Sequence, residues 1–206
     1  MARVMRILAE LGPFFEVTLH ADRPAAPWQP LAGLADSPAL AGRLAEVRTR
    51  LGVDARVAAS VAQLGLVARL VAPVLALAAR GGGVLDLAAG CWRPPLDGTV
   101  ALSLPAARSR EPLATALTAG PIADLSAACG RLGRLSPRVL AGNLASAVNG
   151  AALQLGPRAY PAAAELLAAV SGEDGAPGPG FARRSCCLLY RAAGGGCCGD
   201  CVLARP

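Results

Sequence analysis

Residues 54–80 read DARVAASVAQLGLVARLVAPVLALAAR, and Val57–Ala79 within them is the one stretch long and apolar enough to resemble a membrane span. Asp54 is placed to cap a helix, because its carboxylate can accept hydrogen bonds from the free amides of the first turn. Gln63, Arg69 and Pro73 interrupt the apolar run. We therefore predict a buried, kinked helix that ends at the three following glycines, and no membrane span. Its apolar face, wide enough for the centre of a helical bundle, contains Leu64, Val67, Leu70, Val71, Val74 and Leu77.

Further helical patterns surround this stretch. Ala and Leu, both good helix formers, dominate a composition with only 3% aromatic residues. Apolar residues recur at three- and four-residue spacing within 39–51, 113–130 and 137–155, and Tyr160-Pro161 begins another helix to about Val170. The predicted fold class is α+β and mostly helical: a helical bundle with a small β-hairpin or sheet and a C-terminal cysteine-rich metal-binding segment.

Strand-like composition appears between the helical patterns, and a further extended piece is expected around Phe14–Leu19. Val84–Leu87 and Thr99–Leu104 are the two runs, and Asp97-Gly98 between them is a turn signal. These features predict a β-hairpin or a loose pair of strands. The prolines within residues 21–38 predict an irregular arm, and residues 105–112 predict a polar linker.

Residues 181–203 read FARRSCCLLYRAAGGGCCGDCVL and hold five of the chain's seven cysteines. The glycines at 194–196 let the backbone fold back tightly, so cysteines on either side can meet across a short turn. Converging thiolates are soft ligands that suit an iron–sulfur cluster or zinc. We therefore interpret this stretch as a metal site. The four cysteines that fit the spacing C-C-x10-C-x2-C are Cys186, Cys187, Cys198 and Cys201.

The spacing alone leaves several states of these cysteines open. A structural zinc site with four cysteines usually uses two Cys-x2-Cys knuckles, and only residues 198–201 form one. The adjacent side chains of Cys186 and Cys187 diverge and fit awkwardly on one tetrahedral ion, whereas a two-iron cluster has more separated ligand positions. The spacing favours iron–sulfur over zinc, disulfides or free thiols. Cys197 is an alternative to Cys198 as the third ligand.

The sequence RRSCCLLYR before a Gly-rich turn, with CGDC after it, resembles the end of the FhuF-like ferric-siderophore reductases. Two other stretches resemble this family more weakly: Cys91-Trp92-Arg93-Pro94-Pro95 and residues 142–146 (GNLAS). The resemblance implies an oxidoreductase acting on metal ions in iron acquisition, which reduces siderophore-bound Fe(III) to Fe(II) by one electron and so releases the iron. It implies one [2Fe–2S] cluster, with the ligands Cys186, Cys187, Cys198 and Cys201.

The resemblance also implies a division of the chain and a set of partners. Residues 1–180 would form a mostly helical siderophore-interacting domain, and residues 181–206 the [2Fe–2S]-binding segment. The expected partners are a ferric siderophore and a soluble electron donor such as a ferredoxin or a flavin reductase. No side chain beyond the cluster is expected to act as acid, base or nucleophile. Candidate substrate residues are Trp92, Arg93, Arg183, Arg184 and Arg191.

Two other functions stay open: a zinc-stabilised interaction module, and an iron–sulfur electron-transfer or sensor protein without a siderophore substrate. The net charge and the histidine count argue against several other functions. The net charge is +6 and the arginines are scattered, a pattern that does not favour nucleic-acid binding. The single histidine, His20, excludes a Rieske cluster and a two-histidine iron oxygenase within one chain.

The cysteine content and the N-terminal residues predict the cellular compartment of the protein. Seven cysteines without an apolar secretory signal core predict a reducing compartment, a cytoplasmic location and no stable membrane insertion. Cys91 and Cys129, which lie outside the C-terminal stretch, are expected to be buried as small hydrophobic residues.

Overall fold

The helix between Ala55 and Ala78 (α3) forms the centre of the molecule. The computed structural model describes the chain except residues 1–5, 7, 97, 171, 173–174 and 205–206. As predicted, Asp54 begins α3, because its Oδ1 accepts a hydrogen bond of 2.9 Å from the Val57 amide. By length and composition alone α3 could cross a membrane, yet 72% of its most apolar window is buried inside the fold. It is a core helix, consistent with a soluble protein.

Three helices pack directly on α3: α2 (Pro38–Leu51), α5 (Pro121–Gly133) and α6 (Pro137–Leu155). Each begins with proline in its first turn, and Ser37 and Ser136 cap α2 and α6. The end of α5 approaches α3 so closely that a Cβ placed on Gly133 would lie 2.3 Å from the Ala59 Cβ. This contact therefore requires glycine.

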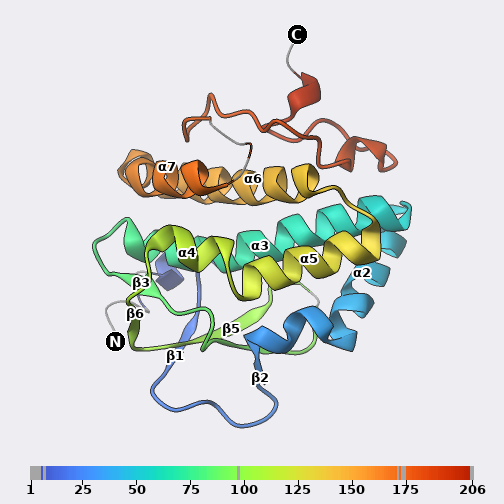
Figure 1. The fold of residues 1–206 in the computed structure, drawn as a ribbon. Helices are drawn as coiled ribbons and strands as arrows, with labels where there is room; N and C mark the ends of the chain where they lie inside the picture. The colour runs from blue at the N-terminus through green and yellow to red at the C-terminus, as the bar shows by residue number, and fades with distance from the viewer. Residues whose placement is uncertain (1–5, 7, 97, 171, 173–174, 205–206) are drawn as a thin grey trace.

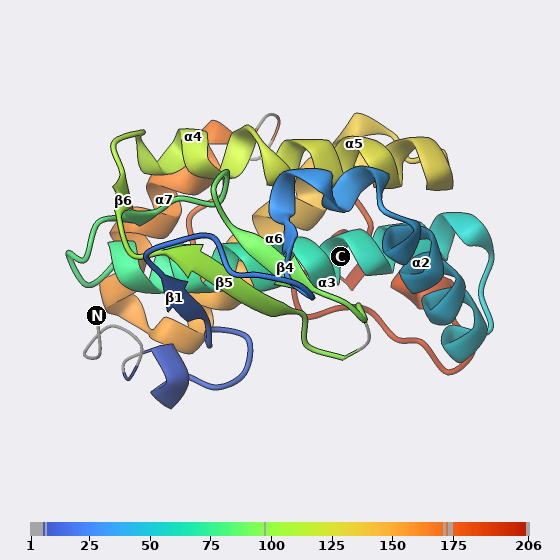
Figure 2. The ribbon, with the colours of Figure 1, turned by 90° about the horizontal axis from the view of Figure 1, so that it is seen from below.

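A four-stranded sheet covers the side of α3 that faces away from α6 (Figures 1 and 2). Its order is β1–β5–β4–β2, with β1 parallel to β5 and the other pairs antiparallel. A second sheet pairs β3 with β6. The strands are β1 (Thr18–His20), β2 (Gln29–Pro30), β3 (Val84–Leu85), β4 (Cys91–Arg93), β5 (Ala101–Pro105) and β6 (Arg108–Ser109).

The C-terminal segment lies on the opposite side of the helices from the sheet. Figure 1 shows it in red, above α6 and α7, while the sheet lies below α3. The helical layers therefore separate the sheet from the cysteine-rich segment. The remaining elements are η1 (Leu31–Asp36), α4 (Leu113–Thr118), η2 (Pro157–Ala159), α7 (Tyr160–Ala169), η3 (Leu189–Arg191) and η4 (Val202–Ala204).

The mostly helical α+β fold class is confirmed, but some local predictions are wrong. Val84–Leu87 and Thr99–Leu104 do not pair with each other: β3 pairs with β6, and β5 lies between β1 and β4. The predicted turn residue Asp97 lies outside the described residues. The helix predicted over 113–130 is divided into α4 and α5, because Gly120 adopts a positive φ and Pro121 starts a new helix.

Two segments expected to be irregular contain short regular elements. Residues 21–38 include β2 and η1, because β2 adds to the free edge of β4 and η1 packs on α5. Residues 105–112 include β6. Both strands are only two residues long, so their formation depends on the partner strand more than on local sequence.

Candidate metal centre

A compact turn folds the C-terminal segment back on itself. Leu188 adopts a left-handed conformation with φ of 69°, and η3 follows it. Gly194 has φ of 70°, and the Gly195 amide donates to the Ala192 carbonyl at 2.8 Å. A Cβ on Gly195 would lie 2.5 Å from the Leu189 carbonyl oxygen, so the turn closes only with glycine there. The predicted role of the glycine run is thus visible in the backbone.

The turn brings sulfurs from its two arms together. The Sγ atoms of Cys187 and Cys198 lie 3.6 Å apart. A disulfide bond is about 2.05 Å long, whereas two thiolates on one tetrahedral metal ion are about 3.8 Å apart for metal–sulfur bonds near 2.3 Å. All seven cysteines are free thiols. The separation of Cys187 and Cys198 therefore suits two ligands of the same metal ion.

Backbone amides contact the two other sulfurs of the motif. The Leu188 amide donates to Cys186 Sγ at 3.3 Å, and the Leu203 amide donates to Cys201 Sγ at 3.4 Å. Cys197 is exposed and Cys198 half-buried. Within the described part of the chain, no three His, Cys, Asp or Glu residues are grouped to hold a single metal ion. The thiols of the segment therefore lie near one another without converging on one ion position in this structure.

Burial and neighbouring groups raise the pKa of Cys186, Cys197 and Cys198. The pKa of Cys198 is raised by burial and by the neighbouring Cys187 and Asp200, and that of Cys186 mainly by burial. Hydrogen bonding to Cys201 raises the pKa of Cys197. At Cys201 burial acts to raise the pKa, but hydrogen bonds from Leu203 and the nearby thiols outweigh it, so the pKa is lowered. Gathered thiolates repel one another, and a bound cation removes that repulsion.

The helical body holds the cysteine segment at several points. Ser60, in α3, donates its hydroxyl to the Cys187 carbonyl at 2.8 Å. Arg191 in η3 pairs with Asp54 at 3.2 Å, so the residue that caps α3 also binds the segment. The two ends of the segment also meet, because the Arg183 amide donates to the Asp200 carbonyl at 3.2 Å. The segment is thus docked on α3.

A buried polar cluster lies directly beneath the segment. Arg183 is 1% exposed and donates through Nη2 to Asn143 Oδ1 in α6. The Asn143 amide in turn donates to the Ser60 carbonyl at 3.0 Å and to Gln63 Oε1 at 2.7 Å. Arg183 Nε and Nη1 are buried and have no hydrogen-bond partner among the described residues. Unpaired buried donors whose charge acts on the Cys186 thiol fit an anionic metal–thiolate group.

The structure separates the candidate substrate residues. Arg184 and Arg191 are exposed on the cysteine segment, whereas Arg183 is buried. Trp92 is 1% exposed in the hydrophobic core, so its ring faces no solvent. The neighbouring Arg93 is exposed, but it lies on the sheet side of the molecule. Trp92 and Arg93 are therefore not brought together with the cysteines.

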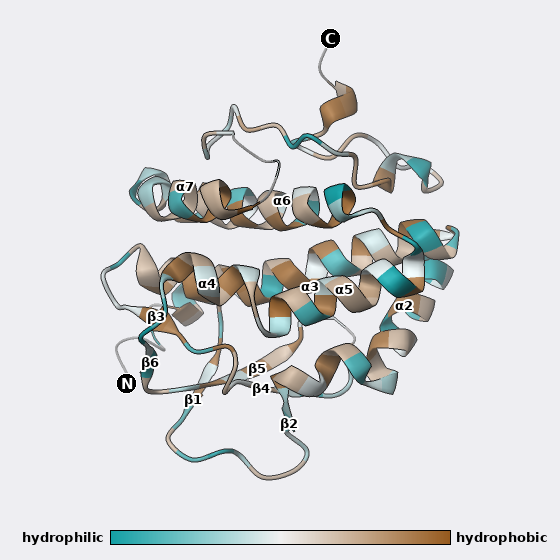
Figure 3. Cartoon of the chain, in the orientation of Figure 1, coloured by the Kyte–Doolittle hydropathy of each residue, from teal (hydrophilic) through white to brown (hydrophobic). Residues whose placement is uncertain are grey.

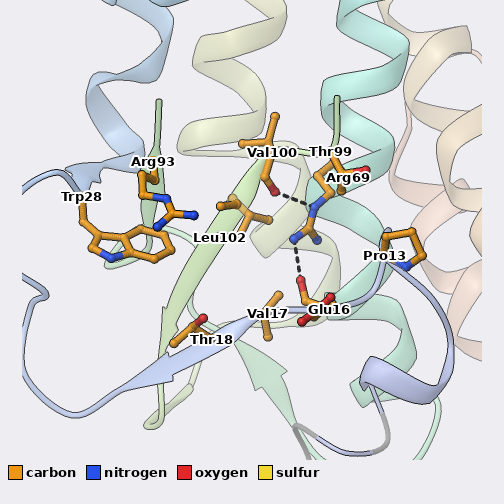
Figure 4. Close-up of a pocket in the computed structure, with 11 residues that line it drawn as sticks. Pro13, Glu16, Val17, Thr18, Trp28, Arg69, Arg93, Thr99, Val100 and Leu102 are labelled. Atoms are coloured by element: carbon orange, nitrogen blue, oxygen red, sulfur yellow. Dashed lines mark hydrogen bonds between the residues drawn. The ribbon is translucent and has the colours of Figure 1, made fainter. Parts of the chain in front are cut away.

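Arg93 lines a different cavity, shown in Figure 4. Its guanidinium lies 5.5 Å from the ring centroid of Trp28. The cavity has a volume of about 320 Å³ and also exposes Glu16 and part of Arg69. Arg69 donates from Nε to the Val100 carbonyl at 2.8 Å and from Nη1 to the Phe14 carbonyl at 2.9 Å. Burial lowers the pKa of Arg69 to about 10, so it stays charged at neutral pH.

A hollow of about 360 Å³ lies beside the cysteine segment and is lined by Arg184 and Arg138 together with Pro137 and Ala141. Sequence reasoning did not single out Arg138. It also missed Ser60 and Gln63 as parts of the buried cluster. Ser60 and Gln63 could have been recognised in the sequence as polar side chains on an otherwise apolar helix.

Three further residues considered in the sequence analysis, Cys91, Cys129 and His20, are held within the body of the fold. Cys91 and Cys129 are buried, as predicted, and burial raises the pKa of Cys129 to about 12. His20 is hydrogen-bonded through Nδ1 to Ser103 Oγ at 2.7 Å, between β1 and β5. None of the three lies in the cysteine segment.

Comparison with known proteins agrees with this geometry. Residues 183–203 match the family model described as the FhuF 2Fe-2S C-terminal domain, and the match covers all five cysteines of the segment. Neither the curated proteins nor the solved structures contain a match to this chain. Over residues 183–203 this chain is therefore similar to the FhuF [2Fe–2S] C-terminal domain, and its cysteine segment is of the kind that binds such a cluster.

Proposed function

We propose that this protein reduces ferric iron held by a siderophore, by one-electron transfer, and so releases it as Fe(II). The observation that supports this most strongly is the contact between Cys187 and Cys198, 3.6 Å apart, within a segment that matches a FhuF [2Fe–2S] domain. We place the activity in the cytoplasm, with a soluble electron donor such as a ferredoxin or a flavin reductase. Residues 1–180 would provide the helical support and residues 181–206 the cluster-binding segment.

The proposed ligands are Cys186, Cys187, Cys198 and Cys201. Cys187 and Cys198, whose sulfurs lie 3.6 Å apart, would hold the cluster from the two arms of the turn, together with Cys186 and Cys201. Cys198 is preferred to Cys197, because Cys198 is half-buried next to Cys187 whereas Cys197 is exposed. When bound, the cluster supplies one electron at a time.

The chemistry of the substrate explains why one electron releases the iron. Siderophores hold Fe(III) through hard oxygen ligands, which bind the smaller and more highly charged Fe(III) far more tightly than Fe(II). Reduction therefore weakens the complex. No side chain of the protein has to transfer a proton or attack a bond.

Exposed cations beside the cluster-binding turn are the proposed docking residues. Arg184 and Arg191 lie two and four residues from a proposed ligand, and Arg138 lines the same hollow as Arg184. Their charges attract an anionic ferric chelate. Arg183 is enclosed by the fold, and Trp92 and Arg93 lie on or next to the sheet, so we do not place them against the chelate.

Metal analysis followed by a reaction with ferric chelates tests the proposal. Protein purified without oxygen should contain two iron and two sulfide per chain, with a red-brown visible spectrum. When the reduced protein is mixed with a ferric trihydroxamate, its re-oxidation should accelerate with chelate concentration, and a ferrous trap should collect iron. Colourless protein with stoichiometric zinc would instead identify a zinc-stabilised interaction module.

An electron-transfer or sensor function is the second candidate, and one surface favours it. The turn η4 projects from the body next to Cys201, and Figure 3 shows it as hydrophobic. Val202 and Leu203 there are 38% and 55% exposed. A reduced cluster that is indifferent to every ferric chelate, but is oxidised by a protein partner, would support this second function over reduction of siderophores.

A further inference from the structure

Arg183 is buried as completely as the core side chains, although it carries a charge. It is 1% exposed and is one of the largest fully buried side chains in the described chain. A buried charge is costly unless it is paired or hydrogen-bonded. Only Nη2 of its guanidinium has a partner, the uncharged Asn143, while Nε and Nη1 have none among the described residues.

Among the described residues Arg69 is also a buried arginine, and it gives an internal comparison. Arg69 is 4% exposed, and its Nε, Nη1 and Nη2 donate to the backbone carbonyls of Val100, Phe14 and Glu16. The fold therefore satisfies a buried guanidinium fully where the site is structural. At Arg183 it leaves two nitrogens without a partner among the described residues, and even the buried Asp200 Oδ2 does not pair with them, which leaves both donors available to a further anionic group.

The surrounding hydrogen bonds fix Arg183 in this position. Asn143 turns its Oδ1 toward Arg183, because its Nδ2 donates to the Ser60 carbonyl and to Gln63 Oε1. Gln63 is held in turn by its own donation to Ser126 Oγ at 3.1 Å. Ser60 binds the Cys187 carbonyl as well, so one network holds both the arginine and a proposed ligand.

The same position lies within the cysteine segment. Arg183 is three residues before Cys186, and its amide donates to the carbonyl of Asp200, next to Cys201. Four thiolates and two sulfides around two irons form a net anion, which gains one further negative charge on reduction. A fixed buried cation beside it favours the reduced state over the oxidised state.

We propose that Arg183 is a positioning residue that serves as the buried counter-ion of the cluster, held by Asn143 and raising the reduction potential. This inference rests on the proposed [2Fe–2S] site and adds the residue that sets its potential. Burial distinguishes Arg183 from Arg184 and Arg191, a difference that the sequence alone does not show. Arg184 and Arg191 are exposed, so water and salt screen their charges, whereas the charge of Arg183 is not screened.

The test compares Arg183→Gln with Arg184→Gln in the cluster-loaded protein. Both changes remove one positive charge from neighbouring residues, but only the first removes it from the interior. The reduction potential is measured by redox titration followed by electron paramagnetic resonance. Arg183→Gln should shift the reduction equilibrium at least tenfold toward the oxidised state, or about 59 mV for one electron. Arg184→Gln should shift it less than threefold, and Arg183→Lys should recover most of the loss.

Cofactor-free protein provides the second readout. Removal of an unpaired buried charge should leave the melting temperature of apo Arg183→Gln no lower than that of the apo wild type, while the loaded variant should release iron faster to a chelator. If Arg183→Gln does not retain a cluster, the potential of Arg183→Lys is measured instead. A variant that is folded without iron but does not retain a cluster supports the counter-ion role.

Three results would overturn the inference. Equal shifts of potential in Arg183→Gln and Arg184→Gln would show that burial of Arg183 does not matter to the cluster. A large loss of apo stability in Arg183→Gln would show that Arg183 is simply a structural residue. Wild-type protein that contains zinc and no cluster would overturn the proposed function, and this inference with it. The first two results would leave the proposed function intact.

Discussion

Cys187 and Cys198 are the residues on which the proposed site depends most directly. Their sulfurs approach from opposite arms of a glycine turn, at a separation suited to one shared metal ion and not to a disulfide. Cys197 is adjacent in sequence but exposed. A single position along the chain therefore separates a proposed ligand from a surface thiol.

Serine substitutions distinguish these two cysteines. Cys198→Ser should lose most of the visible absorbance of the cluster and at least half of the bound iron, because a hydroxyl is a poorer ligand than a thiolate. Cys197→Ser should keep both within error. The measurement is the visible spectrum with iron and sulfide analysis after anaerobic reconstitution. The reverse pattern would assign the third ligand to Cys197.

Ser60 connects the helical core to the cysteine segment, so its removal should affect both stability and the cluster. Ser60→Ala removes the donor to the Cys187 carbonyl and an acceptor for Asn143 inside the protein. We expect a loss of about 1–3 kcal/mol in the free energy of unfolding, since buried polar groups are left unpaired. Cluster release to a chelator should also be faster.

Ser126→Ala is the matched control for Ser60→Ala, because Ser126 lies at the half-buried far end of the same network. Water can replace its hydroxyl, so the loss should be smaller. Chemical denaturation measures both variants. Equal losses would mean that contact with the cysteine segment adds nothing to the role of Ser60.

At the scale of elements, sequence patterns predicted where the long helices begin better than they predicted which strands pair. Ser37-Pro38 and Asp54 fix the starts of α2 and α3, because capping is a local interaction. The pairing of β3 with β6 places Val84 opposite Ser109 and Leu85 opposite Arg108, residues distant in sequence, and no local signal specifies it. Trp92 illustrates the same limit, since its burial depends on the sheet against which it packs.

In the candidate site, too, the local features were predictable from the sequence and the long-range contacts were not. The cysteine motif is local, so its spacing and glycine turn predicted a metal site. The Ser60–Gln63–Asn143–Arg183 cluster joins α3, α6 and the C-terminal segment, and the sequence alone does not tell which face of each helix turns toward the others. Ligand candidates were therefore predictable, whereas the buried support beneath them was not.

The contact between α5 and α3 gives a prediction about helix packing. Gly133→Ala should destabilise the protein by about 1–3 kcal/mol, because the new methyl would meet the Ala59 Cβ at 2.3 Å. Gly150→Ala in α6 is the control: nothing lies within 4 Å of a Cβ there, and alanine favours helix by about 0.5–1 kcal/mol. Thermal and denaturant unfolding should move in opposite directions for the two variants.

The junction between α3 and η3 gives a prediction about pH. The Val57 amide and the Arg191 guanidinium hold the pKa of Asp54 below its ordinary value of 3.8. A lowered folded pKa means that the carboxylate stabilises the fold above about pH 4 and that this contribution is lost as the pH falls further. Asp54→Asn keeps a capping oxygen but removes the charge.

Unfolding measured across pH tests this prediction. The wild type should be more stable than Asp54→Asn at about pH 6, and the difference should shrink as the pH falls below about 4 and through the lowered pKa of Asp54. Arg191→Gln should reduce the difference, because it removes the ion pair but leaves the cap. A difference that is constant with pH would mean that the charge of Asp54 has no part in holding the segment.

At the scale of the whole molecule, the helical layers place two candidate surfaces on opposite sides. The cysteine segment with Arg184 and Arg191 lies beyond α6, and the cavity with Arg93 and Trp28 lies at the sheet (Figures 1 and 4). A chelate at the sheet would be separated from the proposed cluster by the helices. Only the surface at the cysteine segment suits direct reduction.

Charge-removing variants on the two sides test this arrangement. The double variant Arg184→Gln, Arg191→Gln should lower the second-order rate of reduction of an anionic ferric chelate several-fold at low salt, and less at high salt. Arg93→Gln removes a cation from the opposite side and should leave this rate within twofold. Stopped-flow absorbance of the pre-reduced protein measures both. A larger effect of Arg93→Gln would place the chelate at the sheet.

The two guanidinium nitrogens of Arg183 that have no partner among the described residues should also affect how long the protein persists in the cell. Ribosomes complete α3 and α6 before residues 183–201 emerge, so the surface that receives the cysteines is made first. A chain that fails to obtain its cofactor keeps a buried charge without a counterpart, and it should open more often to proteases. We expect the abundance of the protein to follow the supply of iron–sulfur clusters even when its synthesis is constant.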